Sequence, residues 1–254
     1  MQRFKNGFPI SLTPREYVEN NAIDEYQEWC KQTAYILKDI GINLNLAPVV
    51  DLSSFEKDYH VLNDRSFGDN IETVNNFAKI LIDEHSNQNI LTCAKHFPGL
   101  GSCSIDPHEN ISNSDKTIEN LKNYHWLPFT NAIKNDVDSI MTTHILNKNL
   151  DCENISTFSA KTIEILRNEL SFDGPILSDD LNMGGAGNSN NIKEISLNAL
   201  KAGHNLIMIS KEIDLQRRAI YCIKESYKRD GDFRLSIERS NGKIERFKNQ
   251  VLST

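Results

Sequence analysis

The segment from Lys95 to His108 combines the side chains that proton transfer needs. Lys95 and His96 directly follow the apolar run 90–94, and a Pro-Gly turn comes next. An apolar run that ends in charged residues and a turn is typical of a buried strand delivering polar groups to one end of a sheet. Asp106 and His108 lie two residues apart, and a carboxylate this close orients an imidazole and raises its pKa. The pair predicts a general acid/base; the alternative is an ordinary solvated loop.

A second candidate is Asp179, which ends the apolar run 175–178 and is followed by Asp180. A single aspartate at a strand end is often only a helix cap, and that remains the alternative for Asp180. Two aspartates after an apolar strand indicate that at least one points into a site. A carboxylate at the mouth of a barrel can act as a nucleophile towards an electrophilic carbon.

Other polar residues near strand ends have two readings each. Adjacent residues on a strand point to opposite faces, so Lys95 and His96 reach one ligand only if the chain bends, and the Pro-Gly turn would supply the bend. Arg65 lies in a loop, where it is either solvated or a ligand contact. His144 ends another apolar run and is either a satisfied core histidine or a site residue. No HxH, HExxH or CxxC spacing supports a metal, so we expect none.

These residues are positioned by alternating apolar runs and amphipathic helices. Thr13 and Glu16 around Pro14 predict a capping box that starts the first helix. The predicted strands are residues 42–50, 90–94, 139–144, 175–178 and 205–209, and the predicted helices are 13–41, 71–87, 117–135, 159–170 and 192–202. This alternation predicts a parallel α/β sheet. Four of the strands end in acidic or basic residues, at Asp51, Lys95-His96, His144 and Asp179-Asp180, which favours a barrel over an open doubly wound sheet.

Composition narrows the function classes. A net charge of -7 argues against nucleic acid as a partner. Five cysteines without a CxxC pair indicate free thiols in a reducing cytoplasm. No apolar stretch approaches the roughly 20 residues that span a bilayer, so no membrane association is expected. Without GxGxxG or Walker A sequences, we expect no nucleotide cofactor, and no other cofactor.

Taken together, the motifs resemble the β-N-acetylglucosaminidases of glycoside hydrolase family 3. The resemblance rests on LAPVVD at 46–51, NDRSFGD at 63–69, KHFPG at 95–99, DPH at 106–108 and FDGPILSDDLNM at 172–183. They occur in the family's order and span nearly the whole chain. The KHFPG and D-x-H pair separates this branch from the family's β-glucosidases.

The resemblance implies a retaining exo-β-N-acetylglucosaminidase that releases terminal N-acetylglucosamine from cell-wall muropeptides in the cytoplasm. Asp179 would be the nucleophile, and His108, held by Asp106, the acid/base. Both groups are carboxylates in the usual scheme. The substrate-binding residues would be Arg3, Arg65, Lys95 and His96.

The resemblance also predicts an incomplete (β/α)8 barrel. About three strand–helix units of the family's catalytic domain precede the point that matches Met1, and the five predicted strands agree with that. We therefore expect residues 1–254 to form a single family 3 catalytic domain truncated at its N-terminus. The alternatives are a phosphorylase, because a histidine acid/base does not repel phosphate, and an inactive truncated remnant.

Overall fold

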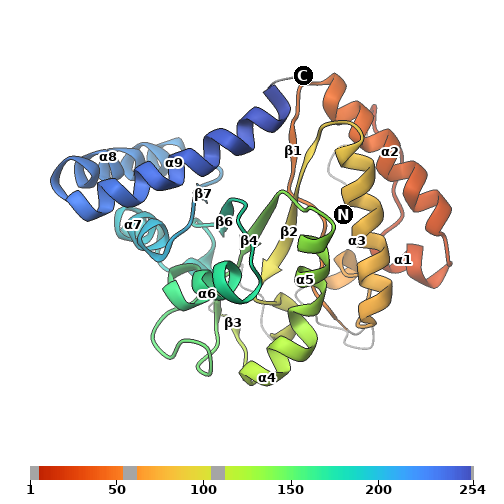
Figure 1. The fold of residues 1–254 in the computed structure, drawn as a ribbon, viewed down its shortest axis with the longest axis horizontal. Helices are drawn as coiled ribbons and strands as arrows, with labels where there is room; N and C mark the ends of the chain where they lie inside the picture. The colour runs from red at the N-terminus through yellow and green to blue at the C-terminus, as the bar shows by residue number, and fades with distance from the viewer. Residues whose placement is uncertain (1–5, 54–61, 104–111, 253–254) are drawn as a thin grey trace.

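Five parallel strands form a curled sheet at the centre of the protein (Figure 1). The computed structural model describes residues 6–53, 62–103 and 112–252. The strands, in hydrogen-bonded order, are β1 (Leu44–Asn45), β2 (Leu91–Phe97), β4 (Ser139–Thr142), β6 (Ile176–Asp180) and β7 (Leu206–Met208). Each strand is parallel to its neighbour and follows it in the chain, as in a (β/α)8 barrel. The predicted class, a barrel-type sheet with five of the eight units, is confirmed.

Helices lie around this sheet (Figure 1). They are α1 (Pro14–Glu19), α2 (Ile23–Asp39), α3 (Ile71–Ser86), α4 (Ile118–Asn120), α5 (Leu127–Lys134), α6 (Ala160–Glu164), α7 (Ile192–Ala202), α8 (Ile213–Arg229) and α9 (Gly231–Leu252). Figure 1 shows α2 and α3 at the β1 end of the sheet and α7 and α8 at the β7 end, with α9 running from beside α8 back across the view towards the C-terminus. In the part of the chain that the structure describes, no helix is long and apolar enough to cross a bilayer.

The observed elements differ from the predicted ones in several places. The first helix is broken at residues 20–22, and π-helical turns (Leu121–His125 and Ile165–Glu169) lie within the predicted helices 117–135 and 159–170. The strand expected over 42–50 is regular only at Leu44–Asn45, with one further bridge from Val49 to Lys95. Two features were not predicted: the α8–α9 pair and a small two-stranded sheet of β3 (Ser112–Asn113) and β5 (Ile145–Leu146).

The predicted capping box is present at the start of α1. The Thr13 hydroxyl accepts a hydrogen bond from the Glu16 backbone N–H at 3.2 Å, and the Glu16 carboxylate accepts one from the Thr13 N–H at 2.7 Å. Pro14 occupies the first turn, where its missing N–H costs nothing. The sequence pattern therefore determines this helix start.

The inner strands β2 and β4 are buried on both faces, whereas the edge strands β1 and β7 are only half-buried. Alternation along the inner strands sorts the side chains. Ala94, Ile140 and Ile176 belong to the large core between sheet and helices. Cys93, Met141 and Leu177 form a separate cluster. Since neighbours on a strand point to opposite faces, this second cluster lies on the concave side of the sheet. The concave face also carries the polar residues described next.

Candidate active site

A small pocket lies at the carboxyl end of the strands, on the concave side of the sheet. Its volume is about 110 Å³, and its lining residues are Leu46, Arg65, Lys95, His96, Leu100, Met141, Asp179, Met183 and Met208. The predicted nucleophile thus lies with three of the four predicted sugar-binding residues. The carboxyl ends of parallel strands are where active sites of barrel enzymes are built.

Strand alternation places Lys95 and Asp179 in this pocket. Lys95 follows Cys93 by two residues on β2, and Asp179 follows Leu177 by two residues on β6. Both therefore continue the concave row of side chains beyond its apolar part. At this position the strands bury the base of the Lys95 and Asp179 side chains, and the charged ends face the pocket.

His96 reaches the same pocket because β2 is irregular. In the pairing with β4, Lys95 lies opposite Met141 and Phe97 opposite Thr142, so His96 is an extra residue without its own partner. A bulge of this kind re-aims a side chain that would otherwise point to the opposite face. The sequence predicted a bend at the Pro-Gly turn, but the reorientation occurs earlier, between Lys95 and Phe97.

Asp51 holds the His96 turn in place. Its carboxylate accepts hydrogen bonds from the His96 backbone N–H (2.9 Å), from His96 Nδ1 (2.7 Å) and from the Leu100 N–H (2.6 Å). Both side chains are buried, at 0% exposure for Asp51 and 5% for His96. Because Nδ1 donates to the carboxylate, Nε2 is the ring nitrogen left for a ligand. Strand-end position was the sequence signal for Asp51, which had not been singled out as a site residue.

The loop that carries Arg65 is tied to the same strand end. Ser66 Oγ donates to the Asp51 carbonyl oxygen at 2.8 Å, and the Ser53 N–H donates to the Gly68 carbonyl at 2.9 Å. Arg65 itself ends a short 3-10 helix (Asn63–Arg65) and is half-buried. The motif around Arg65 therefore folds against Asp51 and brings its guanidinium to the pocket.

Electrostatics keep Asp179 ionised. Burial alone would raise the pKa of its carboxyl, but nearby His96, His144 and Lys95, together with a hydrogen bond from the Asp180 N–H, hold that pKa below its usual range. Burial also lowers the pKa of the Lys95 ammonium, and the Asp179 carboxylate opposes that effect. The arrangement places the Asp179 carboxylate and the Lys95 ammonium in the lining of the same small pocket.

The adjacent Asp180 has a different role from Asp179. Its Oδ1 accepts hydrogen bonds from the backbone N–H groups of Asn182 and Ser210, both at 3.0 Å, and its Oδ2 accepts one from the Ser210 hydroxyl. Asp180 therefore fastens β6 to the segment that follows β7. Of the two aspartates, Asp179 is the one that enters the pocket.

Three of the predicted site residues lie outside the described residues: Arg3, Asp106 and His108. Their predicted roles stay predictions. The sequence leaves open whether His144 is a core histidine or a site residue. In the structure it lies beside the site without lining the pocket, and its ring is fully buried and hydrogen-bonded.

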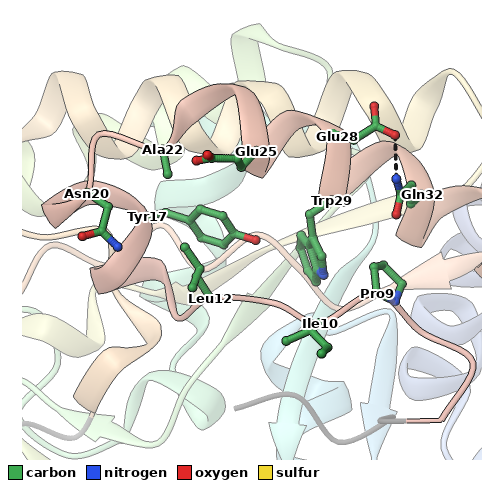
Figure 2. Close-up of a pocket in the computed structure, with 10 residues that line it drawn as sticks. All are labelled: Pro9, Ile10, Leu12, Tyr17, Asn20, Ala22, Glu25, Glu28, Trp29 and Gln32. Carbon is green, nitrogen blue, oxygen red and sulfur yellow. Dashed lines mark hydrogen bonds between the residues drawn. The ribbon is translucent and has the colours of Figure 1, made fainter.

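A larger cleft of about 470 Å³ lies away from these residues, between residues 9–12 and α2 (Figure 2). Figure 2 shows Tyr17 of α1 and Trp29 of α2 facing it. None of the candidate residues that the structure describes, Asp179, Arg65, Lys95 and His96, lines it. An intermediate cleft of about 250 Å³ shares Tyr17 and Trp29 with it, and Arg65 and Lys95 with the small pocket. The small pocket is the candidate site, because Arg65, Lys95, His96 and Asp179 all line it.

Comparison with known proteins agrees with this geometry. Residues 1–231 match the family described as the glycosyl hydrolase family 3 N terminal domain. The chain belongs to glycosyl hydrolase family 3. The proteins named Beta-hexosaminidase from Haemophilus influenzae and Glaesserella parasuis are 32% and 34% identical to it over 217 residues. These alignments cover 84% of the chain and 61% and 62% of the two relatives, so the chain spans about three fifths of their length.

Solved family 3 structures share the fold. The β-N-acetylglucosaminidase from Paenibacillus sp. superposes with a TM-score of 0.90 at 26% identity, covering 98% of this chain and 47% of that chain. The β-N-acetylglucosaminidase from Thermotoga maritima superposes with a TM-score of 0.79, also at 26% identity, covering 95% of this chain and 51% of that one. The fold of this chain is therefore shared with about half of each of these two structures.

Proposed function

We propose that this family 3 chain carries the active site of a retaining exo-β-N-acetylglucosaminidase. In the first step the Asp179 carboxylate attacks the anomeric carbon, the bond to the leaving oxygen breaks, and a glycosyl–enzyme ester forms. In the second step water attacks the same carbon and releases Asp179. The observation that carries the proposal is the position of Asp179: an ionised carboxylate in a pocket at the carboxyl edge of the sheet, facing Lys95 and His96.

Proton transfer in both steps falls to His108, oriented by Asp106. His108 donates its proton to the leaving oxygen in the first step and takes one from water in the second, so the enzyme ends in its starting protonation state. Such a group contributes about 10²–10⁴-fold to the rate.

Sugar binding falls to Arg65, Lys95 and His96, with Arg3 as a further contact. Arg65 and Lys95 line the pocket with N–H groups that can donate to sugar hydroxyls, and the anchoring of His96 Nδ1 by Asp51 leaves Nε2 for a contact with a sugar hydroxyl. The relatives named Beta-hexosaminidase and β-N-acetylglucosaminidase support a terminal N-acetylglucosamine as the group that is bound. We propose muropeptides as the substrates and the cytoplasm as the location.

The proposal is tested with the chain itself and p-nitrophenyl N-acetyl-β-glucosaminide. We expect nitrophenol release, with the β-anomer of N-acetylglucosamine as the first product by NMR. Asp179→Asn should abolish release, and His108→Ala should lower it. Asp214→Asn, which removes an exposed carboxylate on α8 (88% exposed side chain), is the matched control and should leave the rate unchanged.

Three results would speak against this mechanism. They are no release from a folded sample, equal rates in Asp179→Asn and Asp214→Asn, and an α-anomer as the first product. If phosphate in the buffer diverts the product to a sugar 1-phosphate, the enzyme is a phosphorylase that uses the same Asp179 intermediate.

A further inference from the structure

His144 contacts the residue that follows the candidate nucleophile. It follows β4, and its ring is fully buried. Nδ1 lies 2.8 Å from Thr157 Oγ1, and Nε2 lies 3.0 Å from the carbonyl oxygen of Asp180 on β6. His144 therefore links two neighbouring strands at the level of the pocket without lining the pocket.

The partners of the ring show that Nε2 carries a proton. A carbonyl oxygen only accepts hydrogen bonds, so Nε2 must carry a hydrogen and donate it to Asp180. Thr157 Oγ1 also lies 3.1 Å from the Thr143 carbonyl oxygen. The Thr157 hydrogen goes either to that carbonyl, with Nδ1 then also donating, or to Nδ1. The bond from Nε2 to Asp180 is the same in both cases.

Asp180 passes this constraint on to Asp179. The Asp180 backbone N–H donates to Asp179 Oδ1 at 2.8 Å. The Asp180 carboxylate is held at the other side by Ser210. The bond from His144 to the Asp180 carbonyl and the bond from Ser210 to the Asp180 carboxylate together restrain Asp180, and Asp180 supplies the N–H that Asp179 Oδ1 accepts.

We propose that His144 is a positioning residue for Asp179, acting through the hydrogen bond from Nε2 to the Asp180 carbonyl. The proposal rests on the function proposed for Asp179. The electrostatic effect has the matching sign, because His144, like His96 and Lys95, lowers the pKa of the Asp179 carboxyl, which burial alone would raise. Besides His96 and Lys95, the charged side chain of Arg65 also lines the pocket that contains Asp179.

Two substitutions separate the hydrogen bond from the rest of the ring. His144→Leu fills the space but removes the donor, whereas His144→Gln keeps an N–H near the position of Nε2. We expect His144→Leu to lower kcat by about 10–100-fold, because a misplacement of 1 Å costs up to about 10²-fold. KM should change little, and His144→Gln should restore most of kcat.

The matched control is His204→Leu. His204 is also buried, and its Nδ1 lies 3.0 Å from the Ala199 carbonyl and its Nε2 2.7 Å from Thr142 Oγ1, with no bond to Asp179 or Asp180. The His204→Leu variant should keep the kcat of the unsubstituted chain. Equal losses in the two leucine variants, or no recovery with glutamine, would show that His144 is only part of the core and would overturn the proposal.

A second measurement does not depend on turnover. The Asp179 carboxyl carbon is followed by NMR as a function of pH and is identified by its absence in Asp179→Asn. We expect the Asp179 titration to shift upward in His144→Leu and to stay in place in His204→Leu. An unshifted titration in His144→Leu overturns the proposal even where the chain shows no hydrolysis, so this result is separate from the test of the proposed function.

Discussion

Replacing Asp51 with asparagine should be one of the most damaging single-atom changes in this protein. The buried carboxylate accepts three hydrogen bonds, two from His96 and one from Leu100, at 2.6–2.9 Å. An asparagine side chain offers one oxygen instead of two. In its best orientation the amide oxygen keeps the two His96 bonds, and the amide NH₂ then faces the Leu100 N–H.

The size of the effect follows from these contacts. A hydrogen bond to a charged acceptor contributes about 1.5–3 kcal/mol, and a buried donor left without an acceptor costs about 1–3 kcal/mol. One bond is lost outright and two are weakened, so Asp51→Asn should lower the free energy of unfolding by about 3–5 kcal/mol, the range seen when one partner of a buried pair is removed. For a domain of this size that corresponds to a drop of about 6–20 °C in Tm.

Urea unfolding followed by circular dichroism measures this difference. Asp64→Asn is the matched control, because Asp64 is an exposed carboxylate next to the Arg65 of the site, and it should change the unfolding free energy by less than about 0.5 kcal/mol. If Asp51→Asn unfolds within about 1 kcal/mol of the native chain, Asp51 is not the anchor of the His96 turn.

Two further predictions concern packing and pH. Gly101→Ala should destabilise the protein, because a Cβ there would lie 1.8 Å from the Leu52 carbonyl oxygen. In Gly242→Ala, the new Cβ on α9 meets nothing within 4 Å, and the substitution should stabilise the protein by about 0.5–1 kcal/mol. Thermal unfolding compares the two variants, and equal changes in Tm would contradict the close approach at Gly101. Burial lowers the pKa of three histidines, His85, His125 and His204, from 6.5 to about 4. Between pH 4 and 6.5 the unfolded chain therefore binds more protons than the folded one, so the contribution of these histidines to stability is full above pH 6.5 and is lost as pH falls towards 4. Urea unfolding at several pH values should show this decline, and His125→Leu should make it shallower. An equally steep decline in His125→Leu would exclude His125 as a cause of the pH dependence.

Much of the fold was predictable because the strands are short, apolar and separated by helices with clear start signals. The capping box at Thr13 and the exact span of α7 illustrate how local chemistry determines an element. The short β1 was overestimated, because an apolar run predicts burial but does not fix backbone pairing. The pair α8 and α9 was missed, since long polar helices show less contrast with loops than the apolar runs do.

The sequence by itself determined which chemical groups are available and on which strand ends they lie. Lys95, His96 and Asp179 were identified from residue type and position alone, as were Asp106 and His108. Only the tertiary structure decided how the described ones are aimed. The bulge at His96, the three bonds of Asp51 and the distinction between Asp179 and Asp180 all depend on partners about 30 to 50 residues away in the chain. Hydrogen bonds between segments that meet only when the sheet forms leave no local pattern in the sequence. The sequence can therefore identify the residues of the site but not the directions in which their side chains point.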